Sequence, residues 1–328
     1  MSQAQPKRGR FVERSAPDRR TEFKPKLGVD LNGVKFSNPV LTASGCFHYG
    51  REFEPYLDVR KLGGVIVKSL SVKPWPGHAP PRGAEVTSGM LNAIGLQNPG
   101  VAAFCDRELP WLLDRGATVV ASIVGNTVEE YIRVTDRLRN VAGITAIEVN
   151  ISCPNLEDRS RMFSSTPDST SAVVRAVRRV ATQPVFTKLS PDVTDIVAIA
   201  KAAVSGGTHG LSVINTALGM AVDTESFAPK LSTFTGGLSG PALKPLALRC
   251  VYQVSRAFPD VPIIGQGGIW NGADVAEFML AGAWAVAVGT ANFVEPSASI
   301  RILDEFRAYL VRKGVREASA LRRMLKDG

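Results

Sequence analysis

Short runs of apolar, often β-branched residues recur along most of the chain, and segments with helical spacing lie between them. The runs are nearly continuous rather than alternating, which is typical of parallel strands covered on both faces. We predict strands at 39–43, 65–68, 118–124, 146–151, 185–189, 210–214, 262–265 and 284–288, and helices at 127–138, 169–180, 193–203, 242–258, 273–281 and 297–311. Eight strands that alternate with helices predict an α/β fold, a closed (β/α)8 TIM barrel.

A short β-hairpin is predicted before the first strand of the barrel. The segment VDLNGVKF, residues 29–36, contains Asn32-Gly33, the residue pair that a two-residue type I′ turn favours. Two connections from strand to helix are unusually long, at 69–98 and 216–240. In a barrel both would lie on the C-terminal face, where active sites form. We therefore expect one domain, residues 27–328, with elaborated loops on that face.

The net charge of +9 is concentrated at the start of the chain. Residues 1–26 carry eight basic and three acidic side chains and few aliphatic ones, whereas the rest of the chain is nearly balanced. This composition predicts a basic flexible tail. No basic stripe with interleaved aromatic residues is present, so we expect no specific nucleic-acid partner.

The composition favours a reduced, cytoplasmic protein that does not contact a membrane. No apolar run approaches the roughly 18 residues that cross a bilayer, and the start lacks the apolar core of a secretory signal. The four cysteines, Cys46, Cys105, Cys153 and Cys250, show no CxxC spacing. No His/Cys/Asp cluster has metal-ligand spacing, so no metal is expected.

Glycines follow the last two predicted strands. Gly267 and Gly268 come after the seventh strand, and Gly289 and Thr290 after the eighth. Glycine exposes backbone N–H groups there, and helix N-termini follow, which is the usual phosphate site of this fold. Tight turns without a ligand are the alternative, but the paired occurrence favours a phosphate.

Two lysines end apolar strands, Lys68 the second and Lys188 the fifth. An ammonium group in an apolar barrel mouth is costly unless it meets an anion. A reduced flavin and a substrate carboxylate would each supply one. Extension of both side chains to solvent is the alternative.

Cys153 lies in a loop of hydrogen-bonding groups, NISCPN at 150–155, which is a poor place for a packing thiol. A thiol can act as a general base near neutral pH if its surroundings lower its pKa. None of the three histidines, His48, His78 and His209, is a natural partner, so proton transfer is favoured over a Cys-His nucleophile. Amides near several strand ends suggest a pyrimidine-like or imide-like substrate; they are Asn92, Asn98, Asn150, Asn155 and Asn215.

Several ordered motifs together resemble class 1 dihydroorotate dehydrogenase, and most closely the catalytic chain of its NAD-linked, two-subunit type. The resemblance covers about residues 28–312. It rests on NPVLTASGCFHYG (38–50), GGVIVKSLSVKPWPGHAPPR (63–82), SGMLNAIGLQNPG (88–100), NISCPN (150–155), KLSPDV (188–193), VINTALGMAVD (213–223), GGLSGPALKP (236–245) and GQGGIWNGADVAEFMLAGAWAVAVGT (265–290). Cysteine in NISCPN separates the chain from the class 2 enzymes, which have serine there.

The resemblance implies an FMN-containing barrel that oxidises (S)-dihydroorotate to orotate in pyrimidine biosynthesis. Cys153 would take the proton from C5 while hydride passes from C6 to flavin N5, and Lys188 would stabilise the anionic reduced flavin. The implied substrate residues are Lys68, Asn92, Ala93, Ile94, Gly95, Leu96, Asn150, Asn155, Asn215 and Thr216. The implied FMN residues are Ser44, Lys68, Ser69, Ser122, Asn150, Lys188, Ile214, Gly240, Gly267, Gly268, Gly289 and Thr290.

Two positions depart from the family pattern. The stretch 156–168, expected to form the lid that carries Cys153, is usually glycine-rich, and here Phe163 is followed by Ser164 rather than glycine. Ser122 stands where relatives often have an asparagine that contacts FMN.

The resemblance also implies partners. We expect a homodimer, or a heterotetramer with a subunit that carries FAD and a [2Fe-2S] cluster, because this chain has neither a cysteine cluster nor a GxGxxG motif. A single-subunit route to fumarate or another soluble acceptor is the alternative. Two other functions stay open: a flavin-dependent enzyme acting on a related pyrimidine such as dihydrouracil, and a catalytically silent flavin-binding barrel.

Overall fold

The computed structural model describes residues 23–152, 154–155 and 161–326. In this part of the chain eight parallel strands close into a barrel, in the order in which they occur in the sequence. They are β3 (Val40–Thr42), β4 (Gly64–Ile66), β7 (Val119–Ile123), β8 (Ile144–Asn150), β11 (Val185–Leu189), β12 (Gly210–Val213), β17 (Ile263–Gln266) and β18 (Ala285–Val288). Each overlaps one predicted run, so the predicted (β/α)8 barrel is confirmed.

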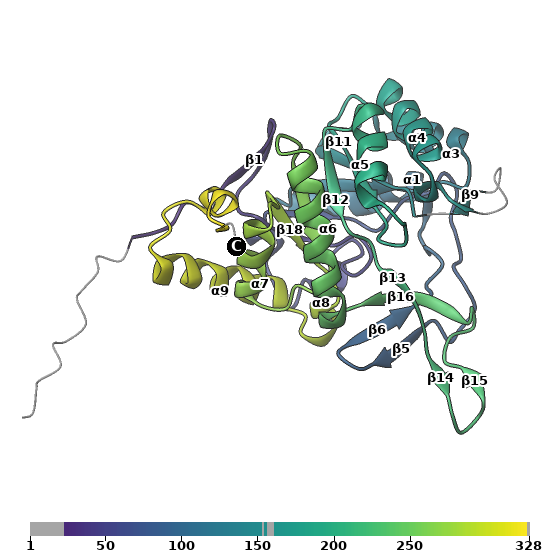
Figure 1. Cartoon of the computed structure of the whole chain (residues 1–328). Coiled ribbons are helices and arrows are strands. Elements are labelled where there is room, and N and C mark those ends of the chain that lie inside the picture. The colour runs from purple at the N-terminus through teal and green to yellow at the C-terminus, as the bar shows by residue number, and fades with distance from the viewer. Residues whose placement is uncertain (1–22, 153, 156–160, 327–328) are drawn as a thin grey trace, which may run out of the picture.

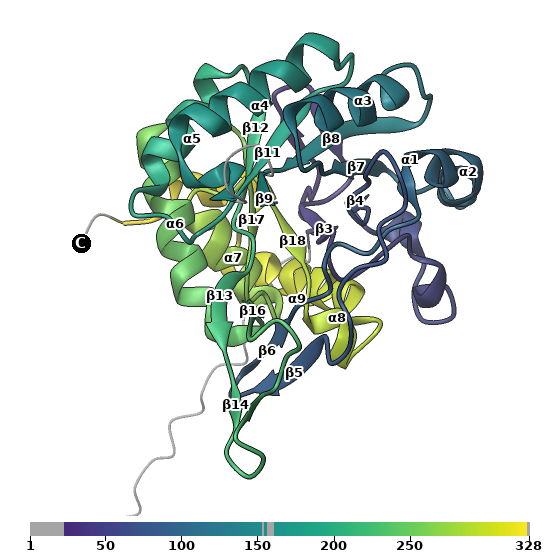
Figure 2. The same cartoon turned by 90° about the vertical axis from the view of Figure 1, so that its right-hand side faces the viewer.

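Helices surround the barrel (Figure 2). They are α1 (Gly100–Ala103), α2 (Leu109–Asp114), α3 (Val128–Leu138), α4 (Pro167–Val180), α5 (Ile196–Ser205), α6 (Lys244–Ala257), α7 (Gly272–Leu280), α8 (Ala291–Val294) and α9 (Ala298–Lys313), with a π-helical stretch, η3 (Phe104–Glu108), between α1 and α2. Short 3-10 turns are η1 (Arg51–Phe53), η2 (Val59–Lys61), η4 (Phe163–Ser165), η5 (Pro241–Leu243) and η6 (Ala318–Arg323). All six predicted helices are present, whereas α1, α2 and α8 were not predicted.

The start of α3 shows how local sequence sets a helix boundary. The hydroxyl oxygen of Thr127 accepts a hydrogen bond from the backbone N–H of Glu130 at 3.1 Å. The carboxylate of Glu130 accepts from the N–H of Asn126 at 2.7 Å, one residue before the cap. Thr127 is therefore the N-cap of α3, and the glutamate reaches one residue further than in a standard capping box.

The predicted hairpin closes the amino end of the barrel. Strands β1 (Val29–Leu31) and β2 (Val34–Phe36) pair antiparallel, and Asn32 and Gly33 have φ of 53° and 96°, as a type I′ turn requires. Leu31 and Phe36 pack in one cluster with inward-facing barrel residues such as Phe186. These side chains fill the lower barrel, so a ligand must enter from the other end.

The two long connections combine into one sheet. Strands β5 (Gly83–Val86) and β6 (Gly89–Asn92) come from the first connection, and β13 (Ala217–Met220) and β16 (Thr235–Ser239) from the second. They pair in the order β13-β16-β6-β5 and project from the barrel together with the hairpin β14 (Val222–Asp223) and β15 (Ala228–Pro229), as Figure 1 shows. The sequence predicted two elaborated loops but not their pairing.

Along several barrel strands, an inward-facing apolar residue is followed two positions later by an inward-facing polar residue. The change occurs on β7, β8, β11 and β17, and also on the continuation of β4. The pairs, apolar residue first, are Ile66 and Lys68, Val120 and Ser122, Ala146 and Glu148, Phe186 and Lys188, and Ile264 and Gln266; all are buried. Because side chains alternate with a period of two, each strand carries an apolar layer below and a polar layer above. Of the upper layer, Lys68, Lys188 and Gln266 line the floor of the site, whereas Ser122 and Glu148 stay beneath it.

The ends of the described chain lie together. Lys26 donates its backbone N–H to the carbonyl of Arg316 at 2.8 Å, and its ammonium lies 2.9 Å from the carboxylate of Glu317. Lys26, the last residue of the predicted basic tail, therefore packs against the C-terminal segment. The first 22 residues of that tail lie outside the described residues. Within the described residues, no helix has both the length and the apolarity needed to span a bilayer.

Candidate active site

A cavity of about 540 Å³ opens at the carboxyl ends of the barrel strands. The loops after β3, β4, β7, β8, β12, β17 and β18 and the end of β11 contribute to its wall, and the projecting sheet covers one side. The structure brings together here most of the residues predicted from the sequence: Ser44, Lys68, Ser69, Asn92, Ala93, Ile94, Gly95, Leu96, Asn150, Lys188, Ile214, Asn215, Thr216, Gly240, Gly267, Gly268, Gly289 and Thr290.

Three predicted site residues do not join this set. Ser122 is fully buried and does not line the cavity; its hydroxyl lies 2.9 Å from Ser69 Oγ and 3.1 Å from Glu148 Oε1. Cys153 lies outside the described residues, and so does the side chain of Asn155. The backbone of Asn155 belongs to β9 (Pro154–Asn155), which pairs with β10 (Arg161–Met162).

Other lining residues were missed by the sequence analysis. They include Cys46, Trp75, His78, Met90, Asn126, Ser152, Gly237, Ser239, Leu243, Gln266, Ile269, Trp270 and Phe293. Gln266 could have been found, because it follows the inward-facing Ile264 by two residues. Trp75 and Trp270 come from loops, Phe293 from α8 and Met90 from the projecting sheet, and no local pattern reveals how these segments meet.

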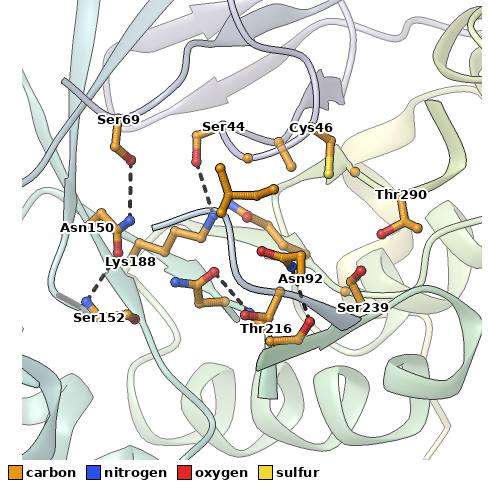
Figure 3. A pocket seen from close by; sticks show the side chains of 18 of the residues that line it. Ser44, Cys46, Ser69, Asn92, Asn150, Ser152, Lys188, Thr216, Ser239 and Thr290 are labelled. Atoms are coloured by element: carbon orange, nitrogen blue, oxygen red, sulfur yellow. Dashed lines mark hydrogen bonds between the residues drawn. The ribbon is translucent and has the colours of Figure 1, made fainter. Parts of the chain in front are cut away.

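Both lysines lie inside the cavity wall. Lys68 and Lys188 are each only 4% exposed, so the alternative in which they extend to solvent is wrong. The Lys188 ammonium donates to Ser44 Oγ at 3.4 Å, a contact drawn in Figure 3. Burial lowers the pKa of Lys68, and the charges of Lys188 and Arg82 lower it further, while Cys46 partly opposes them. The cavity therefore presents concentrated positive charge to a bound molecule.

Amide side chains are fixed around this charge (Figure 3). Asn150 donates to Ser69 Oγ at 3.3 Å and accepts from the backbone N–H of Ser152 at 3.2 Å. Asn92 donates to the carbonyl of Gly237 at 3.1 Å. These bonds hold the amide groups in defined orientations. Asn215, the third predicted amide here, also lines the cavity, and its side-chain oxygen accepts from the backbone N–H of Thr216 at 2.9 Å.

Asn98, also singled out from the sequence, has a structural role instead. Its side-chain oxygen accepts from the N–H and the hydroxyl of Ser71 and from the N–H of Gly100. It fixes the turn into α1 and does not line the cavity.

The glycine loops fit a phosphate group through their backbone. Gly267 and Gly268 have φ of 116° and 79°, and a Cβ on Gly268 would lie 2.7 Å from the backbone nitrogen of Lys244. A side chain is excluded there, which leaves backbone N–H groups at the cavity wall.

The N-terminus of α7 is not the predicted phosphate site. The N–H of Gly272 donates to the Glu305 carboxylate, and those of Ala273 and Asp274 donate to the side chain of Asn271. The first donors of the helix are therefore already used, and α8 is too short to add a substantial dipole. The groups in the cavity wall that suit a phosphate are therefore the loop backbone and the Thr290 hydroxyl.

The hydroxyl of Ser152, in the cavity wall, is further evidence that the cavity binds a ligand. The hydroxyl of Ser152 is buried and has no hydrogen-bond partner among the described residues. A buried hydroxyl without a partner is costly. The buried lysines, oriented amides, glycine loops and this hydroxyl together fit a flat, polar, phosphorylated cofactor with an anionic substrate beside it.

A second thiol also reaches the cavity. Burial raises the pKa of Cys46 from 9.0 to about 11, although Lys68, Lys188 and a hydrogen bond with Thr290 act in the opposite direction. The thiol is therefore uncharged at neutral pH and cannot serve there as a base.

The fold and the cavity define a barrel enzyme whose site, at the C-terminal mouth, is lined by two buried lysines and by glycine loops. The chain belongs to the dihydroorotate dehydrogenase family, a family of flavin-dependent oxidoreductases, whose model matches residues 26–310. A relative from Citrifermentans bemidjiense, named dihydroorotate dehydrogenase B (NAD(+)), catalytic subunit, is 50% identical over 91% of this chain and 97% of its own length. A relative of the same name from Alkaliphilus metalliredigens is 47% identical over 91% of this chain and 98% of its own length.

A solved structure shares the fold. The crystal structure of the dihydroorotate dehydrogenase from Eimeria tenella in complex with ferulenol aligns with a TM-score of 0.75, over 93% of this chain and 90% of that one. The sequences are 23% identical, so this likeness concerns the barrel alone.

Proposed function

We propose that this chain oxidises (S)-dihydroorotate to orotate with bound FMN, as a step of pyrimidine biosynthesis. The observation that carries the proposal is the convergence of Lys68, Lys188 and three oriented amides on one cavity beside glycine loops. Dihydroorotate has a carboxylate and a ring of alternating N–H and C=O groups, which are the partners that ammonium and amide groups bind. The names of the relatives support the same reaction.

The residues suited to FMN form two groups. Gly267, Gly268, Gly289 and Thr290 offer backbone and hydroxyl groups to the phosphate, and the residues suited to the ring are Ser44, Lys68, Ser69, Asn150, Lys188, Ile214 and Gly240. Ser122, predicted as a direct contact, does not line the cavity, and we propose that it acts through Ser69, whose Oγ lies 2.9 Å from its own. Bound FMN supplies a hydride acceptor, and the buried Lys188 ammonium offsets the negative charge that reduction adds.

The substrate residues lie on the side of the projecting sheet. Lys68 provides the positive charge for the substrate carboxylate. Asn92, Asn150, Asn215 and Thr216, with the backbone from Ala93 to Leu96, bind the ring, and we place Asn155 in this group from its position in the sequence.

Cys153 is proposed as the base that removes the C5 proton while hydride leaves C6. The preceding residue, Ser152, lines the cavity, which brings the chain to the reacting centre immediately before the thiol. Cys46, the other thiol near the cavity, is disqualified because burial raises its pKa to about 11.

We further propose a partner subunit that carries FAD and a [2Fe-2S] cluster and transfers the electrons to NAD. The relatives are named as catalytic subunits of an NAD(+) enzyme. The sequence has no GxGxxG motif and no cysteine cluster, so another chain must hold these groups. Two copies of each chain would form the heterotetramer.

The test combines one substitution with one titration. Purified protein is expected to be yellow, and Cys153→Ser should retain the flavin but lose most dihydroorotate turnover near neutral pH. Cys105→Ser, outside the cavity wall, is the matched control and should be unaffected. Undiminished turnover in Cys153→Ser would refute the assigned base.

A titration with product analogues decides whether the substrate is dihydroorotate or a related pyrimidine such as dihydrouracil. Orotate should perturb the flavin absorbance at much lower concentration than uracil, because uracil lacks the carboxylate that Lys68 binds. Equal responses would favour an enzyme acting on dihydrouracil. No response to either, with flavin bound, would favour a silent flavin-binding barrel.

A further inference from the structure

A buried carboxylate lies beneath the cavity. Glu148, on β8, is fully buried in the barrel interior and does not line the cavity. Carboxylates are rarely found fully buried unless they are paired, because their desolvation is costly. Its side chain must therefore have a compensating set of partners.

Those partners come from four other strands of the barrel. Oε1 accepts from Ser122 at 3.1 Å and lies 4.0 Å from the ammonium of Lys188. Oε2 accepts from Ser212 at 2.8 Å and from the amide of Gln266 at 3.3 Å. Glu148 thus ties together β7, β11, β12 and β17 at one level of the barrel.

Two of these partners reach upward into the site. Lys188 and Gln266 both line the cavity, whereas Ser122 and Ser212 are fully buried below it. Any influence of Glu148 on a bound molecule is therefore transmitted through the lysine and the amide.

The charges in this region explain why a carboxylate is placed here. The cavity wall contains two buried lysines, and none of its described lining residues is an aspartate or glutamate. Lys188 has Glu148 as its counter-charge from below, whereas Lys68 has no ion-pair partner in the described part of the chain. The lysines and Glu148 together therefore have one excess positive charge, carried by Lys68.

We propose that Glu148 is a positioning residue that holds the ammonium of Lys188 at the floor of the cavity and offsets its charge. This inference rests on the proposed function only in naming FMN as the group above Lys188. A buried ion pair of this kind makes a definite prediction: removal of one partner is strongly destabilising, and removal of both is much less so.

The experiment is a double-mutant cycle on the full-length chain with FMN removed, since bound ligand adds its own stabilisation. Lys188→Met leaves the Glu148 carboxylate buried without a counter-charge and should lower the Tm. Adding Glu148→Gln to that variant should raise the Tm again, on the order of 5 °C. If Lys188→Met does not fold alone, folding of the double variant is the expected rescue.

A purely structural Glu148 predicts the opposite result. If the carboxylate only bound its two serines and Gln266, the two substitutions would add, and the double variant would melt no higher than Lys188→Met. That outcome, or a double variant that fails to fold while Glu148→Gln folds, would overturn the proposal.

A second readout uses the flavin. Reduced flavin carries more negative charge than oxidised flavin, so Glu148→Gln should shift the midpoint potential of bound FMN to a more positive value. Ser212→Ala, which removes one hydrogen bond to Glu148 without a change of charge, should leave it unchanged. An unshifted potential in Glu148→Gln, or an equal shift in both variants, would contradict the proposal. A wild-type chain that binds no FMN would refute the proposed function, whereas the stability cycle would still decide the role of Glu148.

Discussion

Replacement of Lys68 by methionine should weaken the binding of orotate and raise the Tm of the ligand-free protein. Methionine keeps most of the aliphatic stem and removes the ammonium, so the change isolates the charge. Lys68 is 4% exposed and has no ion-pair partner in the part of the chain that the structure describes. The Lys68→Met substitution therefore tests whether the uncompensated positive charge of the cavity serves to bind an anionic ligand.

The loss of binding can be sized from the contact it removes. A charge-assisted hydrogen bond to a buried carboxylate contributes about 1.5–3 kcal/mol, which corresponds to a roughly 10- to 150-fold weaker Kd for orotate. The assay is an orotate titration followed by the absorbance of the bound flavin. Lys201→Met, on the exposed face of α5, is the matched control and should bind as the wild type does.

The gain in stability follows from the lowered pKa of Lys68. Burial, the largest cause, lowers that pKa below its ordinary value of 10.5, so the unfolded chain holds the proton more tightly than the folded one. The charged lysine destabilises the folded state below the folded pKa, and this penalty disappears as the pH rises to 10.5. At pH 7, without ligand, Lys68→Met should therefore melt higher than the wild type. Orotate binding at wild-type strength, or a lower Tm, would refute this reasoning.

Two further predictions concern the phosphate loop and the second thiol. Gly289→Ala should weaken FMN binding about tenfold or more. The Tm of the flavin-free protein should stay nearly unchanged, because the added Cβ would meet only Cys46 Sγ at 3.3 Å and Ala43 Cβ at 3.5 Å. Gly28→Ala, outside the site, is the control, and equal FMN affinity in the two variants would contradict the assignment. Because burial raises the pKa of Cys46 to about 11, iodoacetamide at pH 8 should alkylate it on the order of a hundredfold more slowly than free cysteine, as measured by peptide mass spectrometry. Labelling at the rate of free cysteine would show that the pKa of this thiol is not raised.

Much of the candidate site could be predicted because polar residues at the ends of apolar strands stand out in the sequence. Lys68, Lys188 and Asn150 were identified in this way, and all three line the cavity. Ser122 was placed at the flavin by resemblance alone, and the structure shows it fully buried and outside the cavity wall. A strand pattern gives the face of each residue but not its height relative to a cavity.

Glu148 marks the limit of the same reasoning. In sequence it is one acidic residue within an apolar strand, between Ile147 and Val149. Its importance depends on partners 26, 40, 64 and 118 residues away, which come together only when the barrel closes. No local pattern contains that information.

The sequence by itself determined the barrel, the hairpin at its amino end and the end at which the site lies. Strand and helix periodicity and the Asn32-Gly33 turn depend on interactions between near neighbours, and such preferences can be read along the chain. The tertiary structure alone decided that the two long connections pair, with Asn92 opposite Gly237, and that charged groups stack in layers. Those features depend on the register and height of segments far apart in the chain, which are fixed only when the whole core packs.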